Sequence, residues 1–195
     1  MKRIKTAYEI AMEKADELAE SDEQSDKLAK KEEIKPIMSR FFRGKIDTED
    51  LWQEIKDKED EEYYVQAQEL IIDSFGLRNS DEEFDRRKEG LLALESLKGR
   101  QNSSMLEQIL GRLNKLRREH QQQRKSMEER FKKEMEERSQ MQMKPVQTED
   151  GRTVMKLESG VDEETRQKVQ KQLSQLEERS EQMFTDLIEE LKTRI

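Results

Sequence analysis

The chain has 195 residues, of which 43% are charged and only 31% hydrophobic, and its net charge is −8. This balance is too polar for one compact globule of this length and favours elongated helices that share narrow apolar seams. The lack of cysteine excludes disulfides, thiolate metal sites and cysteine nucleophiles. The charged N-terminus is not a signal peptide, and no run approaches the roughly 20 apolar residues that span a bilayer, so we expect a cytoplasmic protein.

The first part of the chain predicts short helices that need partners. An apolar stripe from Ile4 to Leu18 predicts a helix to about Glu20, and it lacks bulky anchors. Residues 21–33 are mostly charged and are compatible with a solvated helix or a loop. Pro36 suits the first turn of a further short helix, and Gly44 suits its left-handed end.

Two longer helices should follow. Asp47 or Thr48 caps a helix that Gly76 closes, and an acidic run at its middle, residues 57–62, is a place where it can be interrupted. Ser80 and Glu83 form a capping-box pattern that opens another helix. We therefore predict an all-α fold with an acidic helical base at 1–99. Five aromatic residues are expected in its core or at an interface: Phe41, Phe42, Trp52, Tyr63 and Tyr64.

The second part contains two apolar stripes that mirror each other. One comprises Ile109, Leu113, Leu116, His120, Gln123, Met127, Phe131 and Met135; the other comprises Val169, Leu173, Leu176, Ser180, Met183, Leu187, Leu191 and Ile195. Pairing them in reverse order gives residue numbers that sum to 303 or 304 in every layer. A constant sum is what an antiparallel helical hairpin requires, because residues advance equally along both axes. We predict a long coiled-coil arm at 103–195.

The arm should end in a small two-stranded β-hairpin. Between the helices, Asp150-Gly151 is a preferred pair for a two-residue type I′ turn, which places Val146 opposite Met155. The predicted elements of the arm are a helix at about 104–141, a hairpin at about 144–157 and a helix at about 162–194. An isolated hairpin is marginal in water, so it should pack on the helix ends or on a partner.

Catalysis is not indicated. The only histidine, His120, falls on the seam and has no glycine elbow beside a nucleophile, so a seam histidine is the better interpretation. The carboxylates have no calcium-loop spacing, and the scattered glycines form neither a phosphate loop nor a dinucleotide fingerprint. We expect no cofactor, no metal and no enzymatic activity.

A basic stretch is one candidate binding surface. Residues 112–133 hold nine basic against three acidic side chains. Arg112, Lys115, Arg118 and Lys125 are placed to neutralise phosphates along one side of a helix. The alternative, which we favour, is that these side chains are solvated or face the acidic run between Asp47 and Glu62.

A methionine-rich tip is the other candidate. Its residues are Met141, Met143, Val146, Val154, Met155 and Leu157. Unbranched thioether side chains adapt to irregular partners, so this tip could grip a docking groove or non-native chains. Filling the junction between helix and hairpin is the alternative.

The order helix, β-hairpin, helix with an apolar tip resembles the architecture of prefoldin subunits. The resemblance covers residues 104–195 and is one of shape, so it assigns no role to any residue. It implies a holdase chaperone whose arm holds client proteins.

The sequence thus leads to a non-enzymatic scaffold or adaptor that presents a coiled-coil arm to a protein partner. Self-association through the base is kept open. A ribosome- or RNA-associated factor that uses the basic helix 112–133 and a prefoldin-like holdase are the alternatives.

Overall fold

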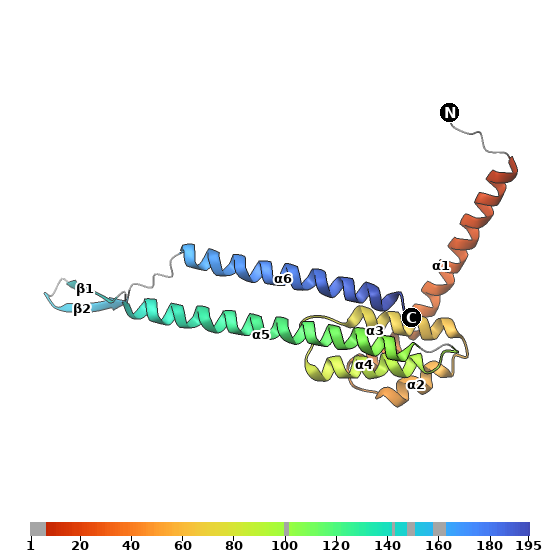
Figure 1. Ribbon diagram of the computed structural model, residues 1–195, viewed down its shortest axis with the longest axis horizontal. Helices are drawn as coiled ribbons and strands as arrows, with labels where there is room; N and C mark the ends of the chain where they lie inside the picture. Colours follow the sequence, from red (N-terminus) through yellow and green to blue (C-terminus); the bar gives the residue numbers. More distant parts are fainter. Residues whose placement is uncertain (1–6, 100–101, 142, 148–150, 158–162) are drawn as a thin grey trace. The chain divides into compact units, whose positions relative to one another are not determined.

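The computed structural model is helical and has two compact units. Its backbone description covers residues 7–99, 102–141, 143–147, 151–157 and 163–195, and its side-chain description covers 24–99, 102–133, 151–153 and 167–195. Six helices and two strands lie in these ranges (Figure 1). Unit 1 comprises Met1–Phe75, Asn79–Leu110 and Ile188–Ile195; unit 2 comprises Gly76–Arg78 and Gly111–Leu187. The first turns of the predicted arm helix and the last residues of the chain therefore group with the N-terminal helices.

Unit 1 begins with one long helix, α1 (Ala7–Phe42), in place of the separate segments that the sequence predicts. Pro36 lies inside α1, although proline removes a helical hydrogen bond and clashes with the preceding turn. Ile34, Met38 and Phe41 on either side of it are almost fully buried. We attribute the continuity of the helix to this burial, since each large apolar side chain contributes about 1.5–3 kcal/mol.

The end of α1 follows the predicted glycine chemistry. Gly44 has a φ of +67°. The amide of Gly44 donates to the carbonyl of Phe41, and that of Lys45 donates to the carbonyl of Arg40, both at 2.9 Å. These two bonds form a Schellman motif, in which a left-handed glycine satisfies the last carbonyls of a helix.

The next predicted helix is divided in two, α2 (Thr48–Lys56) and α3 (Glu61–Ser74), at its acidic run. Asp47 caps α2 through the amide of Asp50 at 2.8 Å, and Asp60 caps α3 through the amide of Glu62 at 2.9 Å. Between them, Glu59 adopts a φ of +54°. The new start of α3 is held by Lys30 of α1, whose ammonium lies 2.9 Å from the Asp60 carboxylate.

Helix α4 (Asp81–Glu95) completes the core of unit 1. The capping box predicted at Ser80 and Glu83 is present: the Ser80 side chain accepts from the Glu83 amide at 3.2 Å, and Glu83 accepts from the Ser80 amide at 2.9 Å. Gly90 allows α1 and α4 to approach closely, because a Cβ at this position would lie 2.6 Å from Cζ of Phe41. The interior of unit 1 is thus packed without spare room at that crossing.

A buried carboxylate network fixes the start of the next helix. Glu95 is fully buried and accepts from the Gln68 side chain at 2.9 Å and from the amide of Asn102 at 2.7 Å. The ammonium of Lys98 lies 3.4 Å from the same carboxylate. Helix α5 (Ser103–Met141) begins directly after Asn102, so this network defines where α5 leaves the base.

Unit 2 contains most of α5 and of α6 (Glu163–Lys192), which run in opposite directions (Figure 1). Strands β1 (Met143–Gln147) and β2 (Thr153–Leu157) pair antiparallel between them. Val146 faces Val154 in this pairing. The predicted register, with Val146 opposite Met155, is therefore wrong by one residue, because β1 ends at Gln147 and β2 begins at Thr153 instead of the strands being joined by two residues.

The buried face of the two long helices also differs from the predicted stripes. Met183 is 47% exposed, whereas its neighbour Phe184 is only 8% exposed. In α5, Arg117 is 1% exposed, while Leu116 is half-buried and Gln123 is exposed. The buried positions of α5 run from Leu113 by four residues to Arg117 and then by three to His120, and those of α6 run from Ser180 by four to Phe184 and then by three to Leu187. The predicted stripes stepped by three residues and then by four at both places. The two orders are nearly indistinguishable in a sequence, since each advances the chain by about two turns.

Candidate partner-binding site

A polar layer crosses unit 2 near the middle of the two long helices. Arg117 and His120 of α5 and Ser180 of α6 are all buried. The guanidinium of Arg117 donates to the side-chain oxygen of Asn114 at 2.8 and 3.3 Å. Leu77, just after unit 1's α3, is buried as well and accepts a hydrogen bond from the Gln121 side chain at 3.0 Å.

His120 is the unusual member of this layer. It is 3% exposed, and neither ring nitrogen has a hydrogen-bond partner within the part of the chain that the structure describes. Burial lowers the pKa of His120, the positive charges of Arg124 and Arg78 lower it further, and the carboxylates of Glu177 and Glu181 oppose that shift. The imidazole is therefore held in its neutral form, which suits a packed seam residue.

The segment Gly76–Arg78 covers one side of the two helices. The Arg78 guanidinium lies 3.1 Å from the Glu177 carboxylate of α6, and Arg124 of α5 lies 3.7 Å from the same carboxylate. Together with the bond from Gln121 to Leu77, these contacts join the segment to both helices. The groove described next uses other positions of α5 and α6.

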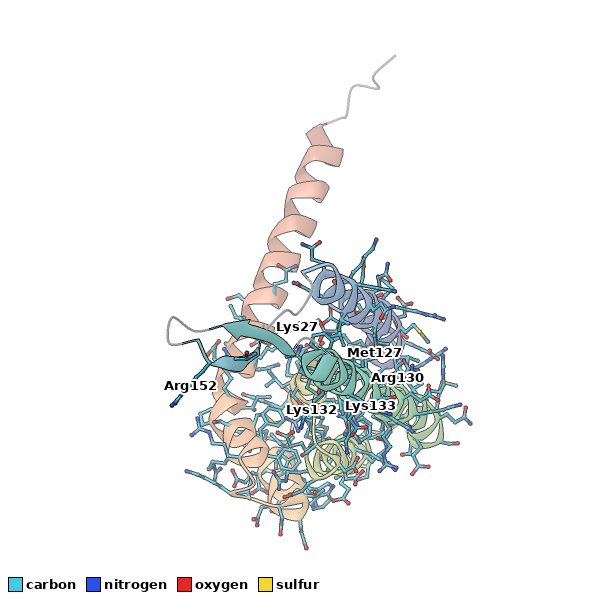
Figure 2. The ribbon with its side chains drawn as sticks, turned by 90° about the vertical axis from the view of Figure 1, so that its left-hand side faces the viewer. Lys27, Met127, Arg130, Lys132, Lys133 and Arg152 are labelled. Carbon is cyan, nitrogen blue, oxygen red and sulfur yellow. The ribbon has the colours of Figure 1, made fainter. Side chains whose placement is uncertain are left out.

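The groove lies between the two helices, nearer to the strands. It encloses about 420 Å³ and is lined by Met127, Arg130, Phe131, Val169, Gln172 and Gln175. Its three apolar residues are half-buried, so part of each side chain stays accessible. Figure 2 shows Met127 and Arg130 close together on α5, with Lys132 and Lys133 further along the same helix. A hollow of this composition offers apolar contact at its floor and hydrogen bonding at its rim.

The surroundings of the groove are basic. The two stretches that form it, 124–133 of α5 and 167–176 of α6, contain seven basic residues and two acidic residues. Arg124 pairs with Glu128 at 2.9 Å, which leaves the remaining cations in excess over the other acidic residue. Such a rim favours a negatively charged partner, through both attraction and faster association.

The predicted phosphate-binding residues, Arg112, Lys115, Arg118 and Lys125, are all exposed on α5. Lys115 lies 3.9 Å from Glu119 on the same helix. Two members of the acidic run pair within unit 1, Glu54 with Arg40 and Asp60 with Lys30. These two carboxylates thus neutralise cations of α1, and the hypothesis that the acidic run faces the basic stretch stays a prediction.

The five aromatic residues of the base have different environments. Phe41 is fully buried in the core of unit 1, whereas Phe42, Trp52, Tyr63 and Tyr64 are half-buried. The Trp52 indole donates to the Ser96 hydroxyl at 3.1 Å, and the Lys56 ammonium lies 4.4 Å from the centre of its ring. Core packing therefore accounts for Phe41, and local polar contacts hold Trp52.

The predicted tip lies outside the described side chains. Its residues are Met141, Met143, Val146, Val154, Met155 and Leu157. Their backbone belongs to the end of α5 and to the two strands. The hypothesis that these residues grip a partner therefore stays a prediction.

Sequence reasoning missed several residues of the groove and of the polar layer. Gln172 and Gln175 carry no signal, because glutamine is common on any solvated helix. Arg117 was assigned to the basic stretch. It is identified as buried only if the apolar stripe steps from Leu113 by four residues to Arg117 and then by three to His120. The same alternative order would have found Phe184 in place of Met183.

Membrane-spanning helices and clusters of metal ligands are both absent from the described helices and side chains. No helix there is long and apolar enough to cross a membrane. The same portion of the chain holds no group of three or more histidine, aspartate or glutamate side chains placed to bind a metal ion.

Comparison with known proteins gives a family. Residues 49–193 match a family of unknown function, DUF6657. The chain belongs to this family. The matched region begins in α2 and includes the polar layer and the groove, while α1 lies before it. No curated protein and no solved structure matches the chain.

Proposed function

We propose that this protein is a non-enzymatic scaffold or adaptor whose α5 and α6 form an antiparallel coiled-coil arm that binds a protein partner. The observation that supports the proposal best is the groove, where Met127, Phe131 and Val169 are accessible on an otherwise strongly charged arm. Accessible apolar side chains that gather within a charged surface are typical of interaction sites. The predicted layer of Leu113 and Leu191, both of which are buried, supports the coiled-coil pairing.

The experiment is affinity capture of the tagged full chain from its native cells after nuclease treatment, with the retained proteins identified by mass spectrometry. The test variant is Phe131→Asp with Val169→Asp. Its control is Gln122→Asp with Thr185→Asp, which adds the same charge at exposed positions of the same two helices. Circular dichroism establishes that both variants keep their helices.

We expect a small stoichiometric set of proteins that the control retains and the groove variant loses. Buried aromatic and aliphatic anchors carry most of the energy of an interface, so one carboxylate at each anchor should weaken binding at least roughly tenfold. If the groove variant retained the same proteins at the same amounts, the groove would not be the binding site.

A second candidate function is contact with structured RNA through Arg112, Lys115, Arg118 and Lys125. Their exposure on one helix favours it. Phosphate contacts release counterions, so RNA binding should weaken steeply with salt, whereas contact at an apolar groove should not. A retained set that nuclease removes, together with loss of RNA binding on substituting these four residues by glutamine, would favour this candidate.

A further inference from the structure

Helix α1 has two halves that need different neighbours. In its second half, Ile34, Met38 and Phe41 are buried within unit 1. Counting back from Ile34 along the same face by threes and fours leads to charged residues, among them Glu23, Glu20 and Asp16. The face that packs in unit 1 therefore becomes mostly charged in the first half of the helix.

The first half carries its own apolar stripe on a different face. Tyr8, Ala11, Ala15 and Leu18 step by threes and fours and so lie on one side of α1. Figure 1 shows this half of α1 extending beyond α2, α3 and α4, the other helices of the unit 1 core. Tertiary packing of an apolar face provides most of the stability of a helix in water, so this stripe is a candidate contact surface.

The charge of this segment complements the groove. Residues 7–26 hold eight carboxylates and one lysine. The stretches that form the groove, 124–133 and 167–176, hold seven basic and two acidic residues around an apolar floor. An acidic helix with a narrow apolar stripe complements a basic groove with an apolar floor in charge and polarity, which is the helix-in-groove mode of recognition.

We propose that residues 7–26 of one copy of the chain bind the groove of a second copy. The inference rests on the proposed function, since it names the partner of the same groove. Twenty helical residues span about 30 Å, which is ample for the groove stretches of about ten residues each. If each copy provides one segment and one groove, two identical contacts form about a two-fold axis, as in most homodimers.

The lack of native cysteine allows a direct test on the full chain. One preparation carries Ala15→Cys, and a second preparation, with a larger tag, carries Gln172→Cys in the groove lining. The two are mixed at low salt under mild oxidation, and disulfide-linked species are resolved by size. The control replaces Ala15→Cys by Glu13→Cys, which lies on the charged face of the same helical turn.

We expect the mixed-tag product to form roughly tenfold faster with Ala15→Cys than with Glu13→Cys, because docking raises the effective concentration of the two thiols. Arg130→Glu with Lys168→Glu should remove this excess. A mixed-tag product no faster than the control overturns the proposal. The doubly substituted chain Ala15→Cys with Gln172→Cys gives the third outcome: a link formed within one chain, without the mixed product, shows that the second copy is not the occupant.

Failure of this inference is distinguishable from failure of the proposed function. If the cysteine link is absent but Phe131→Asp with Val169→Asp still loses captured proteins, the groove binds another partner and only the occupant is wrong. If the cysteine link is absent and the captured proteins are unchanged, both proposals are wrong.

Discussion

The base and the groove-forming part of the arm bury their apolar residues to different extents. In unit 1, Ile34, Phe41 and Leu94 are completely buried. In the groove of unit 2, Phe131 and Val169 are only half-buried. Because the hydrophobic contribution grows with the area removed from water, the base supplies its own stability, whereas the groove leaves part of that contribution to a partner.

The polar groups of the two regions show the same contrast. Glu95, buried in the base, has hydrogen-bond partners in Gln68 and Asn102 and an ion pair with Lys98. His120, buried in the arm, has no hydrogen-bond partner within the described structure. Each oxygen of the Glu95 carboxylate has a partner, whereas in the described structure Oε1 of Gln68 and both ring nitrogens of His120 have none. A buried group with partners fixes one arrangement more firmly than a buried group without them. The arm is therefore the region more easily remodelled by binding.

The largest change in unfolding free energy is expected from one of two matched substitutions, one in each region. Phe41→Ala should lower the free energy of unfolding by about 3–5 kcal/mol, the range for a buried phenylalanine. Phe131→Ala removes a side chain that is already partly exposed and should cost roughly 1–2 kcal/mol. Urea unfolding followed by circular dichroism measures both, and equal losses would contradict the contrast between core and groove.

Glu95→Ala should come next in size. It leaves the buried ammonium of Lys98 and the donors of Gln68 and Asn102 without their acceptor, and loss of one partner of a buried ion pair costs about 3 kcal/mol or more. The matched control is Glu178→Ala on the exposed surface of α6, which should change the free energy of unfolding by no more than about 0.5 kcal/mol. Similar midpoints for the two variants would show that the network does not stabilise the base.

A pair of glycine substitutions tests packing more finely. Gly90→Ala places a Cβ 2.6 Å from the Phe41 ring, and overpacking of this kind costs about 1–3 kcal/mol. Gly111→Ala meets no atom within 4 Å and should stabilise α5 by about 0.5–1 kcal/mol through helix propensity. The melting temperatures of the two variants should therefore shift in opposite directions from that of the wild-type chain. A higher melting temperature in both variants would mean that α1 and α4 leave room for a Cβ at Gly90.

The smallest effect concerns pH. The pKa of His120 is lowered by burial, so the folded state binds fewer protons than the unfolded state once the pH falls below about 6.5. Stability from neutral His120 is then fully present above that pH and is lost progressively below it. Relative to His120→Leu, the wild-type chain should unfold more easily at pH 5.5 than at pH 7.5. If the difference in unfolding free energy between the wild-type chain and His120→Leu were the same at both pH values, His120 would not be desolvated.

Local capping chemistry was the part of the fold that the sequence predicted well. The capping box at Ser80 and Glu83 and the left-handed Gly44 depend on residues close together in the chain, and both are present. The continuity of α1 through Pro36 was not predicted, because it depends on tertiary burial of Ile34 and Met38. Tertiary packing of this kind overrides local propensity.

The arm shows where a periodic pattern is insufficient. A stripe that steps by threes and fours fits two neighbouring faces of a helix, and the choice between Met183 and Phe184 depends on what the opposite helix presents. The strand register was missed for a related reason, since a turn signal fixes register only when the connection is as short as assumed. The groove itself arises from the packing of two helices, so no single segment of sequence contains its signal.

The most direct test of the central claim is hydrogen exchange of the purified full chain, diluted until it is monomeric, with and without the partner that occupies the groove. Amides of α3 and α4 should exchange slowly in both samples. Amides of 124–133 and 167–176 should exchange at least roughly a hundredfold faster alone and slow down when the partner binds. Equal protection of both regions in the purified chain, or groove amides that do not respond to the partner, would contradict the claim that the arm offers an open site.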